Sequence, residues 1–238
     1  MSDARSAQVE QRGDVDRPLV DVVVPSIGRP SLERLLDGLD HELADHPGLV
    51  GCVVVVDDRP APDAALQPPP MQHARCTVVR GPARGPAAAR NAGWQRTTAP
   101  WVVFLDDDVE VGPGWAALLA TDLRSAPSRT VAVQAQIEVP LDGDRPPDDV
   151  ERGVAQLADA AWITADMAVR RVALAEVGGF DERFPRAYRE DTDLALRLSD
   201  AGGRLAVGRR TTRHPVRPTR WTECLGRQRG NADDALMR

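Results

Sequence analysis

The sequence predicts an α/β fold, a single domain with a Rossmann-like, mostly parallel sheet flanked by helices. Four short runs of β-branched apolar residues alternate with segments in which leucine or alanine recurs at helical spacing. Two of these runs end directly in aspartate clusters, and ligands of such sheets bind beyond the carboxyl ends of the strands. A chain of 238 residues is long enough for one domain of this kind.

The first half of the chain supplies the alternation. We expect strands at residues 19–26, 51–58, 76–80 and 101–105, and helices at 31–43, 87–97 and 113–123. Ser31 stands where an N-cap would lie, and Pro47-Gly48 ends the helical spacing that follows it. The segment 59–70 is rich in proline and is predicted to be a loop. Strands and helices in this alternation form a parallel sheet with right-handed crossovers.

The second half of the chain has a different pattern. We expect a long strand at 130–139, a loop at 141–149, a strand-like run at 162–171, helices at 172–179 and 190–203, and a final strand at 204–210. The domain is predicted to cover residues 19–217. Residues 1–18 are expected to be a disordered leader, and residues 218–238 a C-terminal tail with a weak helical pattern.

Composition narrows the classes of function. The net charge of −6 argues against a broad nucleic-acid surface. All thirty basic residues are arginine, which excludes reactions that need a lysine, whereas arginine forks can hold phosphate oxygens. No run approaches the roughly 18 apolar residues of a membrane helix, and the leader has no secretion signal, so a cytoplasmic location is expected. Three widely spaced cysteines argue against a zinc site or a disulfide framework.

Three aspartates, Asp106 to Asp108, follow the strand at 101–105. Side chains two apart on an extended segment point to the same side, so Asp106 and Asp108 are candidate ligands of one divalent cation, Mn²⁺ or Mg²⁺, that bridges diphosphate oxygens. Asp107 would point away. The alternative interpretation is a polar loop that ends the strand.

Asp191 is the candidate general base. At about 100° per residue it shares a helical stripe with Leu194, Ala195 and Leu198, while Asp193 lies nearly opposite. A carboxylate on the inward edge of a first helical turn suits proton abstraction where it lines a pocket. The alternative role is to stabilise the helix dipole.

His214 follows the last predicted strand, where its imidazole can reach a metal ion or a phosphate. A lone histidine is more often structural, so both roles stay open. The other histidines, His41, His46 and His73, lie on a helix face or in a loop and are expected to be solvated.

Six motifs follow one another over about residues 20 to 216: VVVPSIGRPSLERLLDGL, VVVVDD, GPARGPAAARNAGW, WVVFLDDDVE, ITADMAVRRVALAEVGGFDERF and REDTDLALRL. Together they resemble the family 2 glycosyltransferases of the GT-A fold. The D-x-D motif alone is weak support, whereas the ordered set with RN, GGFDERF and ED-x-D is strong support.

The resemblance implies an inverting enzyme that moves a sugar from a nucleotide-diphosphate-sugar donor to an acceptor hydroxyl. It makes Asp106 and Asp108 the metal-binding D-x-D motif, His214 a late metal ligand and Asp191 the catalytic base. Asp166, at a position often held by asparagine, and Glu190 would lie on the substrate side. The residues near the donor nucleotide and its phosphates would be Pro25, Ser26, Asp57, Asp58, Arg84, Arg90 and Asp107. Arg59-Pro60 depart from the small polar residues usual after Asp58. The donor sugar, the acceptor and the oligomeric state do not follow from the sequence.

Two other functions fit parts of the sequence. Residues 106–109 also match the D-x-D-x-V nucleophile motif of haloacid-dehalogenase-like phosphatases, although that motif normally opens the fold and its supporting lysine is missing here. A nucleotide-sugar binding module without turnover would share the fold. The presence of both the D-x-D and the ED acids favours the enzyme.

Overall fold

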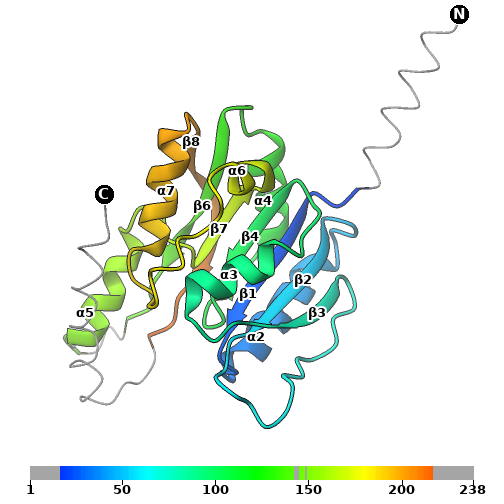
Figure 1. The fold of residues 1–238 in the computed structure, drawn as a ribbon, viewed down its shortest axis with the longest axis vertical. Coiled ribbons are helices and arrows are strands. Elements are labelled where there is room, and N and C mark those ends of the chain that lie inside the picture. The colour runs from blue at the N-terminus through cyan, green and yellow to red at the C-terminus, as the bar shows by residue number, and fades with distance from the viewer. Residues whose placement is uncertain (1–16, 142–144, 148, 217–238) are drawn as a thin grey trace, which may run out of the picture.

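An eight-stranded mixed sheet forms the centre of the protein (Figure 1). The computed structural model describes residues 17–141, 145–147 and 149–216, so most of the predicted leader and all of the predicted tail lie outside the described residues. The strands are β1 (Val20–Ser26), β2 (Val50–Asp57), β3 (Arg75–Arg80), β4 (Trp101–Leu105), β5 (Glu110–Val111), β6 (Thr130–Glu138), β7 (Asp166–Arg170) and β8 (Arg204–Arg213).

The strand order across the sheet is β3-β2-β1-β4-β7-β6-β8-β5. The first four strands in this order are parallel throughout, as their alternation with helices predicts. β7 runs antiparallel to both β4 and β6, and β5 runs antiparallel to β8, whereas β6 and β8 are parallel. The predicted Rossmann-like, mostly parallel sheet is confirmed.

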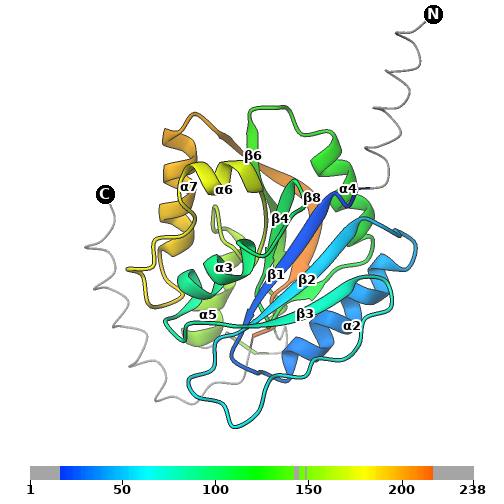
Figure 2. The ribbon, with the colours of Figure 1, turned by 45° about the vertical axis from the view of Figure 1, so that its right-hand side comes forward.

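Helices cover both faces of the sheet (Figures 1 and 2). α2 (Ser31–Leu43) and α4 (Trp115–Arg124) pack on one face, and α3 (Pro86–Trp94), α6 (Arg171–Glu176) and α7 (Glu190–Asp200) pack on the other. The sequence did not predict α5 (Asp149–Ala155) or the 3₁₀ turn Gln156–Ala158 between β6 and β7. Within the described part of the chain, no helix has the length and apolar character needed to cross a membrane.

α2 illustrates how residue spacing fixes the packing. Its buried stripe consists of Leu32, Leu35, Leu36, Leu39 and Leu43. Burial of one such side chain contributes about 1.5–3 kcal/mol. The N-cap prediction is wrong: Pro30 holds that position, and Ser31 lies inside the first turn, where its buried hydroxyl has no hydrogen-bond partner among the described residues.

The strand order creates a switch point between β1 and β4. From β1 the chain winds outward to β2 and β3 and then returns on the other side of β1 as β4. The carboxyl ends of the parallel strands β1, β2 and β4 therefore open at one edge of the sheet, where ligands of doubly wound sheets bind. Ser26, Asp57 and Asp106 stand at or directly after these ends.

A buried ion pair joins β7 to β8. The side chains of Asp166 and Arg210 are both 0% exposed, and Arg210 Nη2 lies 2.8 Å from Asp166 Oδ1. The other carboxylate oxygen accepts hydrogen bonds from the Trp115 indole and the Thr212 hydroxyl, each at 2.6 Å. The sequence placed Asp166 on the substrate side, but here both of its oxygens are taken up by neighbouring side chains. Asp166 therefore holds α4, β7 and β8 together in this structure.

We predict that Asp166→Ala lowers the free energy of unfolding by about 3–5 kcal/mol, because it leaves the Arg210 guanidinium buried without a carboxylate. Urea denaturation measures the change. The control is Asp200→Ala, which removes an exposed acid at the end of α7 and is expected to change stability by less than about 0.5 kcal/mol. Equal effects of the two substitutions would contradict the structural role of Asp166.

Candidate functional site

Asp106, Asp108 and His214 come together at the carboxyl edge of the sheet. One possible ligand atom from each lies within 4.8 Å of the others. His214 follows β8, and its backbone N–H donates to the Glu138 carbonyl at 2.8 Å, which fixes the imidazole near the loop after β4. Its Nε2 is 3.7 Å from Asp108 Oδ1, while its Nδ1 is buried and has no hydrogen-bond partner among the described residues. The two carboxylates supply the oxygen ligands that Mn²⁺ and Mg²⁺ prefer, and the imidazole offers a nitrogen ligand beside them.

Asp107 points away from this cluster, as predicted, although Asp107 and Asp108 form a turn after β4 and not the extended segment that the prediction assumed. Its side chain is 1% exposed, and its two oxygens accept hydrogen bonds from the Ser26 hydroxyl and from Arg29 Nη1, both at 2.6 Å. These contacts join the ends of β1 and β4 across the switch point. The sequence placed Asp107 and Ser26 near the donor nucleotide, and the structure places them in contact with each other.

Arg29 is a site residue that the sequence analysis missed. Its guanidinium lies 2.6 Å from Asp107 and 3.9 Å from Asp108, and about a third of its side chain is exposed. Partial burial alone would lower the pKa of Arg29, but the charge and hydrogen bond of Asp107 raise it above its ordinary value. No spacing pattern indicates this pair, because 78 residues separate Arg29 from Asp107.

Arg90 lies inside the site. Its Nη2 donates to Asp106 at 2.7 Å and its Nη1 donates to Glu190 at 2.8 Å, and its side chain is 3% exposed. Burial alone would lower the pKa of Arg90, but Asp106 and Glu190 raise it above its ordinary value, so the guanidinium stays charged. The sequence placed Arg90 near the donor phosphates, whereas here it bridges two protein carboxylates.

The first turn of α7 carries the ED acids. Glu190 is 2% exposed, and Asp191 is only partly buried. Burial raises the pKa of Glu190 to about 7 against the opposing effect of Arg90, and burial also raises the pKa of Asp191. A raised pKa makes a carboxylate a better proton acceptor near neutral pH.

The predicted apolar stripe of α7, Leu194, Ala195 and Leu198, is buried. Asp193, which the sequence placed nearly opposite this stripe, is also buried, at 9% exposure, whereas Asp191, expected on the inward edge, is only partly buried. Arg197 one turn later donates to Asp193 at 2.8 Å and to the carbonyls of the segment before α7. Helical periodicity distinguishes the two faces of α7. It does not reveal that Arg197 pairs with Asp193 on the polar face.

The two acids at the end of β2 face opposite sides of the sheet. Asp58 accepts hydrogen bonds from the backbone N–H groups of Ala83 at 2.7 Å and Gly85 at 3.2 Å, so it shapes the loop before α3. Burial raises the pKa of Asp58 despite these bonds. Asp57 is held by two nitrogens of Arg59 at 2.8 Å each, and the side-chain hydrogen bond from Arg59 lowers its pKa.

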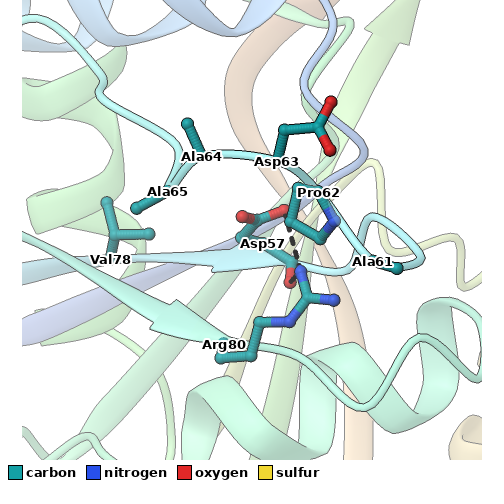
Figure 3. Close-up of a pocket in the computed structure, with 8 residues that line it drawn as sticks. All are labelled: Asp57, Ala61, Pro62, Asp63, Ala64, Ala65, Val78 and Arg80. Carbon is teal, nitrogen blue, oxygen red and sulfur yellow. Dashed lines mark hydrogen bonds and ion pairs between the residues drawn. The ribbon is translucent and has the colours of Figure 1, made fainter.

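An open hollow of about 480 Å³ lies on the Asp57 side of this edge. Figure 3 shows Asp57 and Arg80 facing each other beneath the loop that follows β2. The lining residues are Asp57, Ala61, Pro62, Asp63, Ala64, Ala65, Val78 and Arg80. Its lining combines apolar side chains with two acids, Asp57 and Asp63, and the guanidinium of Arg80.

The remaining predicted residues lie around this edge. Pro25 is half-buried near the end of β1. Arg84, in the loop before α3, has 63% of its side chain exposed and lies 2.5 Å from Glu182. Arg84 is therefore open to a ligand, in contrast to the buried Arg90.

Comparison with known proteins identifies relatives of this chain. The family model described as "Glycosyl transferase family 2" matches residues 21–162. The "Pre-mycofactocin glycosyltransferase" of Mycobacterium tuberculosis is 34% identical over 168 residues, which cover 64% of this chain and 35% of the relative. The chain thus spans about a third of the length of this curated relative.

Solved structures share the fold. The mannosyltransferase PcManGT from Pyrobaculum calidifontis, in complex with GDP-Man and Mn²⁺, superposes with a TM-score of 0.63 at 23% identity, over 90% of this chain and 61% of that one. GalNAc-T7 with UDP, GalNAc and Mn²⁺ superposes with a TM-score of 0.59 at 19% identity, over 86% of this chain and 44% of that one.

We predict that His214→Ala weakens Mn²⁺ binding by at least about tenfold, since loss even of an outer-shell partner of a metal site typically costs 10–100-fold. Titration calorimetry with Mn²⁺ alone measures the affinity, and circular dichroism checks the fold. His73→Ala, which removes an exposed histidine from a loop, is the matched control and should leave the affinity unchanged. Identical Mn²⁺ affinity in both variants would remove His214 from the candidate metal site.

Proposed function

Because this chain belongs to glycosyl transferase family 2, we propose that it transfers a sugar from a nucleotide-diphosphate-sugar donor to an acceptor hydroxyl with inversion. The observation that carries the proposal is the meeting of Asp106, Asp108 and His214 with the acids of α7 around one edge of the sheet. The GDP-Man, UDP and Mn²⁺ bound by its structural neighbours support a donor of this chemical class.

The donor would lie across the switch point. Asp106, Asp108 and His214 would hold a divalent cation, Mn²⁺ or Mg²⁺, whose charge offsets that of the leaving diphosphate. Arg84 is exposed in the loop before α3, so its guanidinium is available to phosphate oxygens. The hollow beside Asp57 offers apolar walls and polar groups to the nucleoside end of the donor.

The acceptor would be activated from α7. In the proposed mechanism Asp191 takes the proton of the acceptor hydroxyl while that oxygen attacks the anomeric carbon, and the bond to the diphosphate breaks. One in-line displacement inverts the configuration at that carbon. Asp191 suits this role better than Glu190, because Glu190 is more deeply buried and is already paired with Arg90.

The phosphatase alternative requires Asp106 as a free nucleophile. In this structure Asp106 accepts a charged hydrogen bond from Arg90 at 2.7 Å, which makes its carboxylate a poorer nucleophile. A binding module without turnover differs from the proposed enzyme only in its rate, so turnover assays separate the two.

We predict that binding of a nucleotide diphosphate requires the metal. Without a cation, Asp106 and Asp108 repel the diphosphate. Calorimetric titrations with GDP and with UDP, each in Mn²⁺ and in EDTA, test this requirement. We expect binding of at least one nucleotide in Mn²⁺ and none in EDTA, and Asp108→Asn should weaken the binding seen in Mn²⁺. Equal affinity in Mn²⁺ and EDTA would contradict the metal assignment.

We predict that Asp191→Asn lowers turnover by roughly 100-fold to 10,000-fold, because it keeps the shape of the side chain and removes the base. Release of nucleotide from GDP-mannose and from UDP-sugars at saturating concentration, with water as the acceptor, measures turnover. Affinity for the nucleotide should change by less than about threefold. Asp200→Asn, at the exposed end of the same helix, is the control. Wild-type turnover in Asp191→Asn would place the base elsewhere.

A further inference from the structure

We propose that Arg90 is a positioning residue that connects the metal-binding loop after β4 to the first turn of α7. In this role it sets where Asp191 stands relative to the leaving diphosphate. The inference rests on the proposed function for the reaction it serves, but the connection itself is a property of the fold. It also replaces the expectation that Arg90 contacts the donor phosphates.

The geometry of the guanidinium supports this role. Two different nitrogens of Arg90 bind two carboxylates that are 84 residues apart, Asp106 at 2.7 Å and Glu190 at 2.8 Å. A planar, always charged fork fixes both partners in direction as well as in distance. The Phe180 ring, 5.6 Å away, lies under the guanidinium and limits its movement.

The residue next to Arg90 extends the connection. Asn91 donates to the Phe180 carbonyl at 2.9 Å and to Glu182 at 3.0 Å, and it accepts from the Phe180 N–H at 2.9 Å. Gly179 must lack a side chain here, because a Cβ atom would stand 2.5 Å from Asn91 Oδ1 at a φ of +76°. The segment that leads into α7 is therefore fastened to α3 by two consecutive side chains.

The loop before α3 holds the same segment from another side. Gly85 has a φ of +97°, and a Cβ atom there would lie 2.1 Å from the Pro185 carbonyl oxygen. Arg84 adds an ion pair with Glu182 at 2.5 Å. α3 and the loop before it contact the segment between α6 and α7 at several points. Substitution of Arg90 is therefore expected to shift the first turn of α7 without unfolding the domain.

Burial argues against a direct phosphate contact. Only 3% of the Arg90 side chain is exposed, so the guanidinium would have to leave both Asp106 and Glu190 to reach a ligand. Arg84 is 63% exposed, so its guanidinium can contact a ligand while Nη2 stays paired with Glu182. The two roles predict different effects of substitution. Loss of a positioning arginine lowers turnover, whereas loss of a phosphate-binding arginine lowers donor affinity.

The test compares Arg90→Lys with Arg124→Lys. A lysine keeps the charge but offers one nitrogen, which cannot reproduce two bonds at fixed directions. We expect Arg90→Lys to keep its affinity for GDP or UDP in Mn²⁺ within about threefold and to lose about 100-fold in nucleotide release from a saturating sugar donor. Arg124→Lys, at the exposed end of α4, is the matched control and should leave this saturated rate within about threefold of wild type. Wild-type turnover in Arg90→Lys, or a loss of nucleotide affinity of tenfold or more, would overturn the proposal.

A stability experiment separates positioning from simple support of the fold. Arg90→Gln leaves Glu190 buried without its partner and should lower the melting temperature by about 10 °C. The double variant Arg90→Gln/Glu190→Gln removes that unpaired charge and should recover much of the loss. Glu190→Gln alone is the reference for turnover. If the double variant regains its melting temperature and turns over as fast as Glu190→Gln, Arg90 only supports the fold and the proposal fails; slower turnover than that of Glu190→Gln supports the positioning role.

The connection can also be measured without any substrate. When Arg90 is present, the change in melting temperature of the double variant Asp106→Asn/Glu190→Gln should differ from the sum of the two single changes. In the Arg90→Gln background the double change should equal that sum. Additive changes in both backgrounds would overturn the connection. If the wild type binds neither GDP nor UDP and releases no nucleotide while the coupling is present, the proposed function fails and the structural connection stands.

Discussion

Two arginines carry their charge in the interior of this protein because carboxylates from distant parts of the chain pair with them. Arg210 lies against Asp166 in the second half of the sheet, and Arg90 lies between Asp106 and Glu190 at its carboxyl edge. A charge taken out of water costs several kcal/mol unless it is paired in good geometry, so each arginine restricts where its partners can lie. The Asp166–Arg210 pair fixes β8 and, with it, His214. The contacts of Arg90 with Asp106 and Glu190 fix the start of α7.

The sheet topology explains why these pairs meet at a site. Parallel winding outward from β1 and the return as β4 bring strand ends that carry acids to one edge. The antiparallel strand β7 next to β4 then carries the chain back, so that α7 and the end of β8 reach the same edge. The candidate ligand and base residues therefore come from three separate parts of the chain, and the fold supplies their proximity.

Local sequence patterns predicted the elements that depend on local interactions. The alternation of apolar strands with helices identified the parallel half of the sheet, and strand ends identified Asp58 and Asp106 to Asp108 as site candidates. Such patterns do not identify interaction partners that are distant in the chain. Nothing near Arg90 indicates that it binds Asp106 and Glu190 rather than a phosphate, and nothing near Asp193 indicates that Arg197 covers it. The resemblance to a family named the positions, and only the structure gave their contacts.

The three consecutive aspartates after β4 contact three different parts of the fold. Asp107 turns toward β1 and binds Ser26, Asp106 binds Arg90 on α3, and Asp108 lies beside His214 after β8. Three adjacent negative charges repel one another, and Arg29 and Arg90 offset part of that repulsion from within the chain. Arg90 donates to Asp106 Oδ1, and Arg29 lies 3.9 Å from Asp108 Oδ2, whereas the other oxygen of Asp108, Oδ1, lies 3.7 Å from His214 Nε2. The arrangement keeps two carboxylates and one imidazole close together, as the proposed cation site requires.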